Sequence, residues 1–136
     1  IAVSDDGRRV WVGETRAEQL REVTGLALST ADGDGEPAQK LPLPGGPDNL
    51  NIAPDGEVLA AVHPTLWRFA LARYEIMGRT RSASRVVRID PDSSTIETVI
   101  DDPDGAYLSG ATAAVAVDGL LIASSVIDDA LLVCRE

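Results

Sequence analysis

The chain has 136 residues, the size of a single domain, with 44% hydrophobic but only 4% aromatic residues and a formal net charge of −10. This charge would repel a phosphate backbone, so we expect no nucleic-acid partner. No stretch reaches the roughly 18 apolar residues of a membrane-spanning helix. We therefore expect a soluble protein without membrane contact, and among compartments we favour the cytoplasm. The single cysteine, Cys134, excludes an internal disulfide and is expected to be a small buried hydrophobe.

A pattern of apolar strand, Asp-Gly turn and second apolar strand occurs three times. The paired segments are residues 1–7 with 10–13, 50–56 with 58–62, and 111–119 with 120–123. Asp-Gly between apolar runs is a strong hairpin signal. The turn glycines Gly7, Gly56 and Gly119 recur at intervals of about 50 to 60 residues, which is close to the spacing of the blades of a β-propeller.

The longer second interval is explained by a predicted helix near residues 65–78. This stretch lacks proline, and its apolar positions at 67, 70, 71, 74 and 77 have helical spacing. Between residues 64 and 81 there are four arginines and one acid: Arg68, Arg73, Arg79, Arg81 and Glu75. A basic helix can lie on a membrane or shield a substrate entrance. We favour a capping helix that packs Trp67, Leu71 and Tyr74 on the blade.

Further apolar segments complete each unit. They are residues 19–23 and 38–43, joined by a loop at 29–37, then 84–90 and 95–100, and finally 130–134. The sequence thus predicts an all-β fold with an inserted helix. The strands would form about two and three-quarter antiparallel blades of a propeller, in units of about residues 1–44, 45–104 and 105–136. Because the last unit lacks a strand, we expect a portion of a propeller completed by N-terminal blades or by a second chain.

Asp48 and Asn49 stand before the apolar strand of the second unit and have two interpretations. Pro47-Asp48-Asn49 has good turn residues. Alternatively, its side-chain oxygens suit a hard cation or a polar substrate at the mouth of a sheet. His63 closes the strand expected to pair with this one, so antiparallel pairing brings His63 and Asn49 to the same end.

Other catalytic and metal motifs fail. Counted from Asp32 as the first position of an EF-hand loop, the required Gly is Pro37 and the required Glu is Leu43. The run 101–105 fails similarly, and we expect both stretches to be solvated turns. With one histidine and no Gly-x-Ser-x-Gly motif, no Ser-His-Asp triad can be assembled.

Five short motifs carry a family resemblance through their order and spacing. They are Pro47-Asp48-Asn49-Leu50, His63-Pro64, residues 84–89, residues 108–112, and the ending 121–134. Together they resemble the C-terminal part of paraoxonase/arylesterase-like proteins, within the wider group of gluconolactonases, regucalcin and strictosidine synthase-like proteins. The resemblance implies a six-bladed propeller with a central calcium ion that hydrolyses small-molecule lactones or aryl esters.

Under this resemblance Asp48 and Asn49 would be two calcium ligands, with Asp48 and His63 as the candidate catalytic residues. The family's other ligands and its catalytic histidine pair have no counterpart among these residues. We therefore expect the 136-residue chain alone to be inactive and to bind calcium weakly or not at all. The alternatives are a gluconolactonase-type hydrolase of sugar lactones and a non-catalytic propeller scaffold or binding module.

Overall fold

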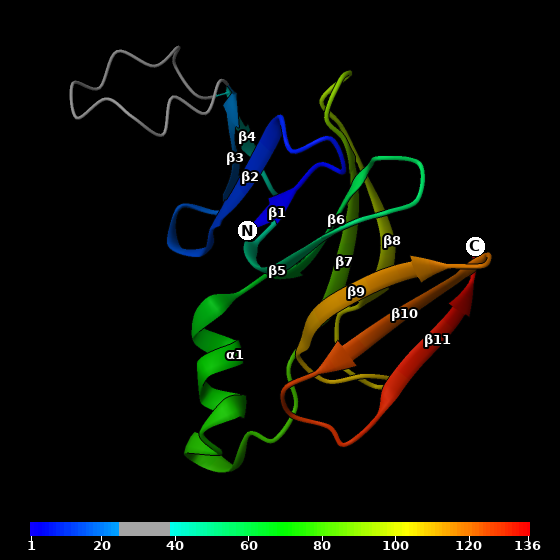
Figure 1. Cartoon of the computed structure of the whole chain (residues 1–136). Coiled ribbons are helices and arrows are strands. Elements are labelled where there is room, and N and C mark those ends of the chain that lie inside the picture. The colour runs from blue at the N-terminus through cyan, green and yellow to red at the C-terminus, as the bar shows by residue number, and fades with distance from the viewer. Residues whose placement is uncertain (25–38) are drawn as a thin grey trace.

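Three antiparallel sheets dominate the computed structural model, which describes residues 1–24 and 39–136 (Figure 1). The first sheet consists of β1 (Ala2–Val3), β2 (Arg9–Glu14), β3 (Gln19–Thr24) and β4 (Gln39–Pro42). The second consists of β5 (Gly46–Ile52), β6 (Val58–His63), β7 (Ser84–Asp90) and β8 (Thr95–Asp102). The third consists of β9 (Ala111–Val117), β10 (Leu120–Ser125) and β11 (Leu131–Arg135). The predicted loop at 29–37 and the Asp32 motif fall outside the described residues.

Strand order in every sheet follows chain order, as in the blades of a propeller. Each sheet is a meander, and β5, the first strand of the second sheet, packs against both β2 of the first sheet and β9 of the third. The predicted all-β class, with two four-stranded units, one three-stranded unit and an inserted helix, is confirmed. The exact unit boundaries stay a prediction.

Two apolar clusters hold the sheets together. The first includes Trp11 and Leu50 and lies between the first and second sheets, while the second includes Leu59 and Leu108 and lies between the second and third. Every residue of β6 is buried, because neighbouring sheets cover both of its faces. Burying a Val or Leu side chain contributes about 1.5 to 3 kcal/mol, so this strand anchors its whole sheet, including the end where His63 lies.

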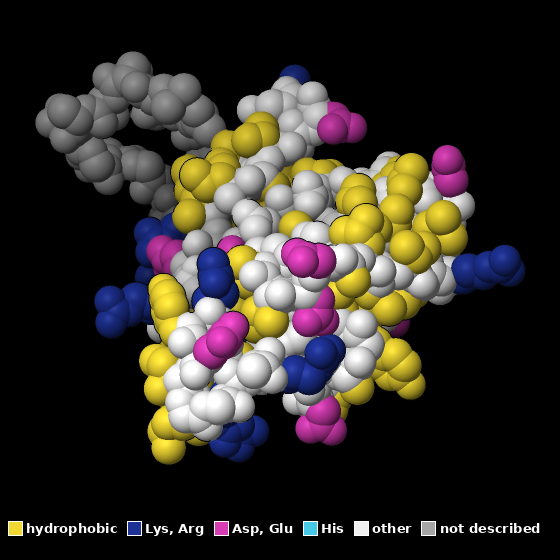
Figure 2. Space-filling model, turned by 90° about the horizontal axis from the view of Figure 1, so that it is seen from below, with side chains coloured by type: hydrophobic (Ala, Val, Ile, Leu, Met, Phe, Trp, Pro, Cys, Tyr) yellow, Lys and Arg dark blue, Asp and Glu magenta, His cyan; other side chains and the backbone are white. Residues whose placement is uncertain are grey.

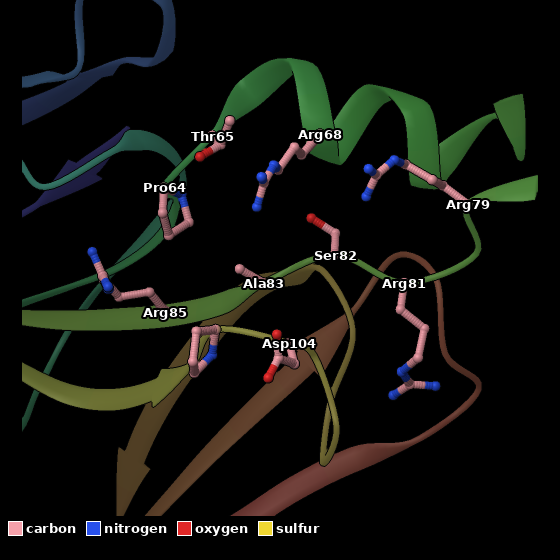
Figure 3. A pocket seen from close by; sticks show the side chains of 10 residues that line it. Pro64, Thr65, Arg68, Arg79, Arg81, Ser82, Ala83, Arg85 and Asp104 are labelled. Carbon is pink, nitrogen blue, oxygen red and sulfur yellow. The ribbon is translucent and has the colours of Figure 1, made fainter. Parts of the chain in front are cut away.

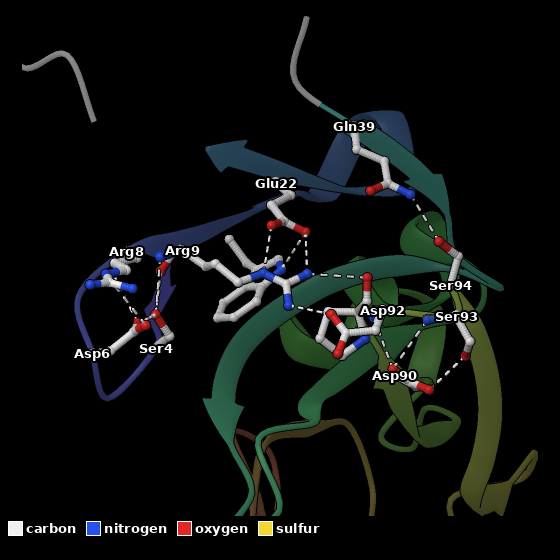
Figure 4. Close-up of polar contacts among 12 residues, drawn as sticks. Ser4, Asp6, Arg8, Arg9, Glu22, Gln39, Asp90, Asp92, Ser93 and Ser94 are labelled. Atoms are coloured by element: carbon white, nitrogen blue, oxygen red, sulfur yellow. Dashed lines mark hydrogen bonds and ion pairs between the residues drawn. The ribbon is translucent and has the colours of Figure 1, made fainter. Parts of the chain in front are cut away.

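A polar contact also ties the first sheet to the second (Figure 4). The Arg9 guanidinium donates two hydrogen bonds to Glu22, at 2.7 and 2.9 Å, and one to Asp92 at 2.6 Å. It also lies 5.2 Å from the centre of the Trp11 ring, whose Nε1 donates to the same Glu22 carboxylate at 3.3 Å. Glu22 is buried, and these donors compensate its loss of water.

The helix inserted between β6 and β7 is shorter than predicted. α1 covers Leu66–Arg73, and a 3-10 turn, η2 (Ile76–Gly78), follows it. The α-helix ends because Glu75 and Met77 adopt left-handed backbone angles, with φ of +53° and +57°. Within the described residues no helix is long and apolar enough to cross a membrane.

The expectation that Trp67 and Tyr74 pack on the blade is wrong, because they are 58% and 73% exposed. Instead α1 buries Ala72 and half-buries Phe69, a face rotated from the predicted one. The stacking of Phe69 on His63, described below, accounts for this rotation. Leu71 is half-buried, so only part of the predicted stripe faces the protein.

Candidate functional site

Asp48 and Asn49 lie inside β5 and do not form the turn before it. Pro47 pairs with Val62 and Leu50 with Ala60, so the register shifts between these pairs. Asp48 and Asn49 therefore occupy a β-bulge, a local irregularity that redirects side chains. In a regular strand neighbouring side chains point to opposite faces, whereas here both side chains are exposed and reach the same residue of β9, Thr112.

A glycine allows β5 to approach the first sheet just before the bulge. A Cβ atom on Gly46 would lie 2.6 Å from the carbonyl oxygen of Thr15, so no other residue fits without a shift of the backbone. The hydroxyl of Thr15 donates to the carbonyl oxygen of Pro47 at 2.6 Å. The residue directly before Asp48 is thereby fixed to η1 (Thr15–Ala17), the 3-10 turn that joins β2 and β3 of the first sheet.

The Asp48 carboxylate has two polar neighbours at one oxygen. The Thr112 hydroxyl donates to Oδ2 at 2.5 Å, and His63 Nε2 lies 3.4 Å from the same atom. These contacts hold the pKa of Asp48 below its ordinary value, first through His63 and then through Thr112, against the opposing effect of burial. Asp48 is therefore an anion at neutral pH, as a metal ligand must be.

The Asn49 amide is oriented by the same threonine. Its Nδ2 donates to the Thr112 carbonyl oxygen at 2.8 Å and to the hydroxyl oxygen at 3.1 Å. The side-chain oxygen of Asn49, the atom that a cation would bind, is consequently free of these contacts. Two residues further along β5, Asn51 donates to the carbonyl oxygen of Ala114 at 2.7 Å. The polar side chains of β5 thus connect the second sheet to β9.

His63 is held between Asp48 and the inserted helix. Its side chain is only 3% exposed, and its ring stacks on Phe69 of α1 with a centroid distance of 3.7 Å and an interplanar angle of 19°. In the part of the chain that the structure describes, Nδ1 has no hydrogen-bond partner. The imidazole therefore presents Nε2 to Asp48 and has little direct access to solvent.

Asp48, Asn49, His63 and Thr112 together form what we call the Asp48 cluster. It can supply two oxygen ligands to a cation, one from Asp48 and one from Asn49. Among residues 1–24 and 39–136 no group of three or more His, Cys, Asp or Glu side chains could hold a metal. Calcium takes six to eight oxygen ligands. The ionised carboxylate and the oriented amide fit calcium chemistry, but these two residues can make up only part of such a site.

Other sequence-based expectations have mixed outcomes. The run 101–105 is not simply a solvated turn, because Asp102 is buried and accepts three backbone hydrogen bonds. Cys134 is half-buried and packs against the second apolar cluster. Sequence reasoning assigned no role to Thr112 or Phe69. Both reach the site across sheet and helix boundaries, which local sequence patterns do not reveal.

Comparisons with known proteins assign the chain to a family. A search of curated proteins gave no significant match. The model of the Arylesterase family matches residues 1–135. The match covers nearly the whole chain, including β5, the end of β6 and β9, and it confirms the resemblance drawn from the motifs. The chain therefore belongs to the Arylesterase family.

Proposed function

We propose that Asp48 and Asn49 are two ligands of a calcium ion in a site that hydrolyses aryl esters or lactones. Membership of the Arylesterase family supports an aryl-ester hydrolase function in general terms. The observation that carries the finer proposal is the bulge in β5, which turns an ionised carboxylate and an oriented amide to one place.

Each residue of the cluster has a distinct part in this proposal. Asp48 and Asn49 hold the cation through their side-chain oxygens, and Asp48 is the candidate catalytic residue because it alone is both charged and accessible. When bound, calcium would supply Lewis-acid polarisation of the ester carbonyl. His63 and Thr112 act through Asp48, since both contact its Oδ2 atom. His63 is thus a positioning residue.

The test measures hydrolysis of phenyl acetate by the protein in the form in which its own cell produces it. The assay is run with calcium present and again after a chelator has removed the calcium. Asp48→Ala is expected to lower kcat/KM by about 100-fold or more, the scale on which a single transition-state contact acts. The matched control is Asp129→Ala, which removes an exposed carboxylate and should leave kcat/KM unchanged. Retained turnover in Asp48→Ala together with an intact fold would refute the assignment.

A substrate panel separates the chemical alternatives. Simple lactones and aryl esters are compared with sugar lactones on the same preparation. Preferential turnover of sugar lactones would favour the gluconolactonase-type reaction, and absence of turnover with every ester and lactone would favour a scaffold or binding module.

A further inference from the structure

A cavity of about 270 Å³ lies between the inserted helix and the start of β7 (Figure 3). Its lining contains four arginines and one acidic residue, in a chain whose net charge is −10. The lining residues are Pro64, Thr65, Arg68, Arg79, Arg81, Ser82, Ala83, Arg85, Pro103 and Asp104. This lining includes no residue of the Asp48 cluster.

Two of the four arginines are engaged by the protein itself. Arg81 donates to the carbonyl oxygen of Gly105 at 2.6 Å and lies 3.2 Å from the Asp128 carboxylate. Arg85 lies 2.9 Å from the Asp101 carboxylate. These two guanidinium groups are thus already neutralised, and they form part of the wall.

Arg68 and Arg79 have no carboxylate within ion-pair distance among the described residues. Figure 3 shows Arg68 extending from α1 and Arg79 from the loop after η2, with both guanidinium groups directed into the cavity above Ser82. Arg68 also lies 5.4 Å from the centre of the Trp67 ring. Asp104, the one acidic residue of the lining, forms no ion pair in the described part of the chain.

The amino-terminal end of α1 adds to the positive potential. Thr65 is the N-cap residue and lines the cavity, and its side chain makes no capping hydrogen bond. Uncapped backbone N–H groups and the helix dipole both favour an anion at such an end. On the face shown in Figure 2, Lys and Arg side chains are scattered and form no continuous basic field. Within the described residues, the positive groups of the cavity that no carboxylate pairs are thus Arg68, Arg79 and the amino-terminal end of α1.

We propose that this cavity binds a small oxyanion, a carboxylate or a phosphate group, through Arg68 and Arg79. Guanidinium groups bind both anions with paired hydrogen bonds, and the cavity holds a group of this size next to the helix end. The site follows His63 directly in sequence, through Pro64 and Thr65, but shares no residue with the Asp48 cluster. The proposal is therefore independent of the hydrolase assignment.

Isothermal titration with inorganic phosphate and, separately, with benzoate tests this site at constant ionic strength. We expect saturable binding of at least one probe to the unaltered protein. The double variant Arg68→Gln/Arg79→Gln should weaken it by about tenfold or more, the effect of losing one or two charge-assisted hydrogen bonds. The matched control Arg73→Gln changes the same residue type on the same helix, outside the lining, and should stay within about twofold.

The probe that binds identifies whether the cavity takes a phosphate or a carboxylate group. No saturable binding of either probe would overturn the proposal, as would an equal loss of affinity in Arg73→Gln, which indicates diffuse electrostatic attraction. Circular dichroism of each variant establishes that it is folded. If the double variant does not fold, the single variants Arg68→Gln and Arg79→Gln replace it, since both side chains are exposed.

Discussion

Thr112 contacts both candidate ligands through different atoms. Its hydroxyl donates to Asp48, and its carbonyl oxygen accepts from Asn49. A single residue of β9 therefore helps His63 to keep Asp48 ionised, and it orients the amide of Asn49. Groups that orient metal ligands in this way affect metal affinity or activity by about 10 to 100-fold.

Replacing Thr112 with Val removes the hydroxyl and keeps the shape of the side chain. We expect the pKa of Asp48 to rise toward its ordinary value, because one of the two groups that lower it is lost. Carboxylate NMR titration measures this pKa, and hydrolysis should fall by about 10 to 100-fold. Thr112→Ser, which retains the hydroxyl, should behave like the unaltered protein. An unchanged pKa in Thr112→Val would show that the hydroxyl does not position Asp48.

Asp102 organises the loop after β8. Its carboxylate accepts hydrogen bonds from the backbone N–H groups of Ala106, Tyr107 and Leu108 at 2.8, 2.7 and 3.1 Å. Burial by itself raises the pKa of Asp102, but these donors together hold it below the ordinary value of 3.8. The ionised form therefore stabilises the folded state.

Asp102→Asn should lower the free energy of unfolding by about 1 to 3 kcal/mol near neutral pH, since buried backbone donors lose a charged acceptor. Because the folded-state pKa is lowered, this contribution is present above the ordinary value of 3.8 and is lost as pH falls through the folded pKa. Urea unfolding at several pH values should therefore show the difference between the two proteins narrowing towards acid pH. The control, Asp129→Asn, changes an exposed carboxylate. A difference that stays constant with pH would contradict this account.

At the scale of elements, α1 forms part of the candidate site through one side chain. Phe69 covers one face of the His63 imidazole, and the ring atom Nε2 lies 3.4 Å from Asp48. The helix thus controls how much of the histidine meets solvent. Trp67, two residues earlier, is exposed and takes no part in this contact.

Phe69→Ala should uncover His63 and accelerate its modification by diethyl pyrocarbonate by about tenfold or more, as expected when a protecting contact is removed. His63 is the only histidine in the sequence, so the absorbance change reports on one residue. Trp67→Ala is the control and should leave the rate unchanged. Equal rates in the unaltered protein and Phe69→Ala would mean that α1 does not shield the imidazole.

The sequence predicted most strands because alternating apolar residues and Asp-Gly turns are local signals. β7 has the predicted bounds, residues 84–90, and β6 extends one residue beyond its prediction to His63. The helix was less predictable. Its apolar residues define more than one possible stripe, and the choice depends on the contact between Phe69 and His63. The bulge in β5 was also missed, because its irregular pairing depends on the partner strand.

At the scale of the whole molecule, the candidate site lies where two sheets meet. Asp48 and Asn49 come from β5 of the second sheet, while Thr112 comes from β9 of the third. Adjacent residues such as Asp48 and Asn49 can be singled out in a sequence, and strand pairing brings His63 near them. Thr112 is 63 residues from Asn49 along the chain, and only the packing of neighbouring sheets reveals its contribution.

The central claim is that Asp48 and Asn49 form part of a calcium site, and calcium titration followed by two-dimensional amide NMR tests it most directly. Two oxygen ligands give weak binding, so we predict saturable shifts only at high calcium, centred on Asp48, Asn49 and Thr112 and abolished by Asp48→Asn. Magnesium is the control, since it demands a tighter octahedral site. Shifts confined to other acidic residues, or unchanged by Asp48→Asn, would contradict the account.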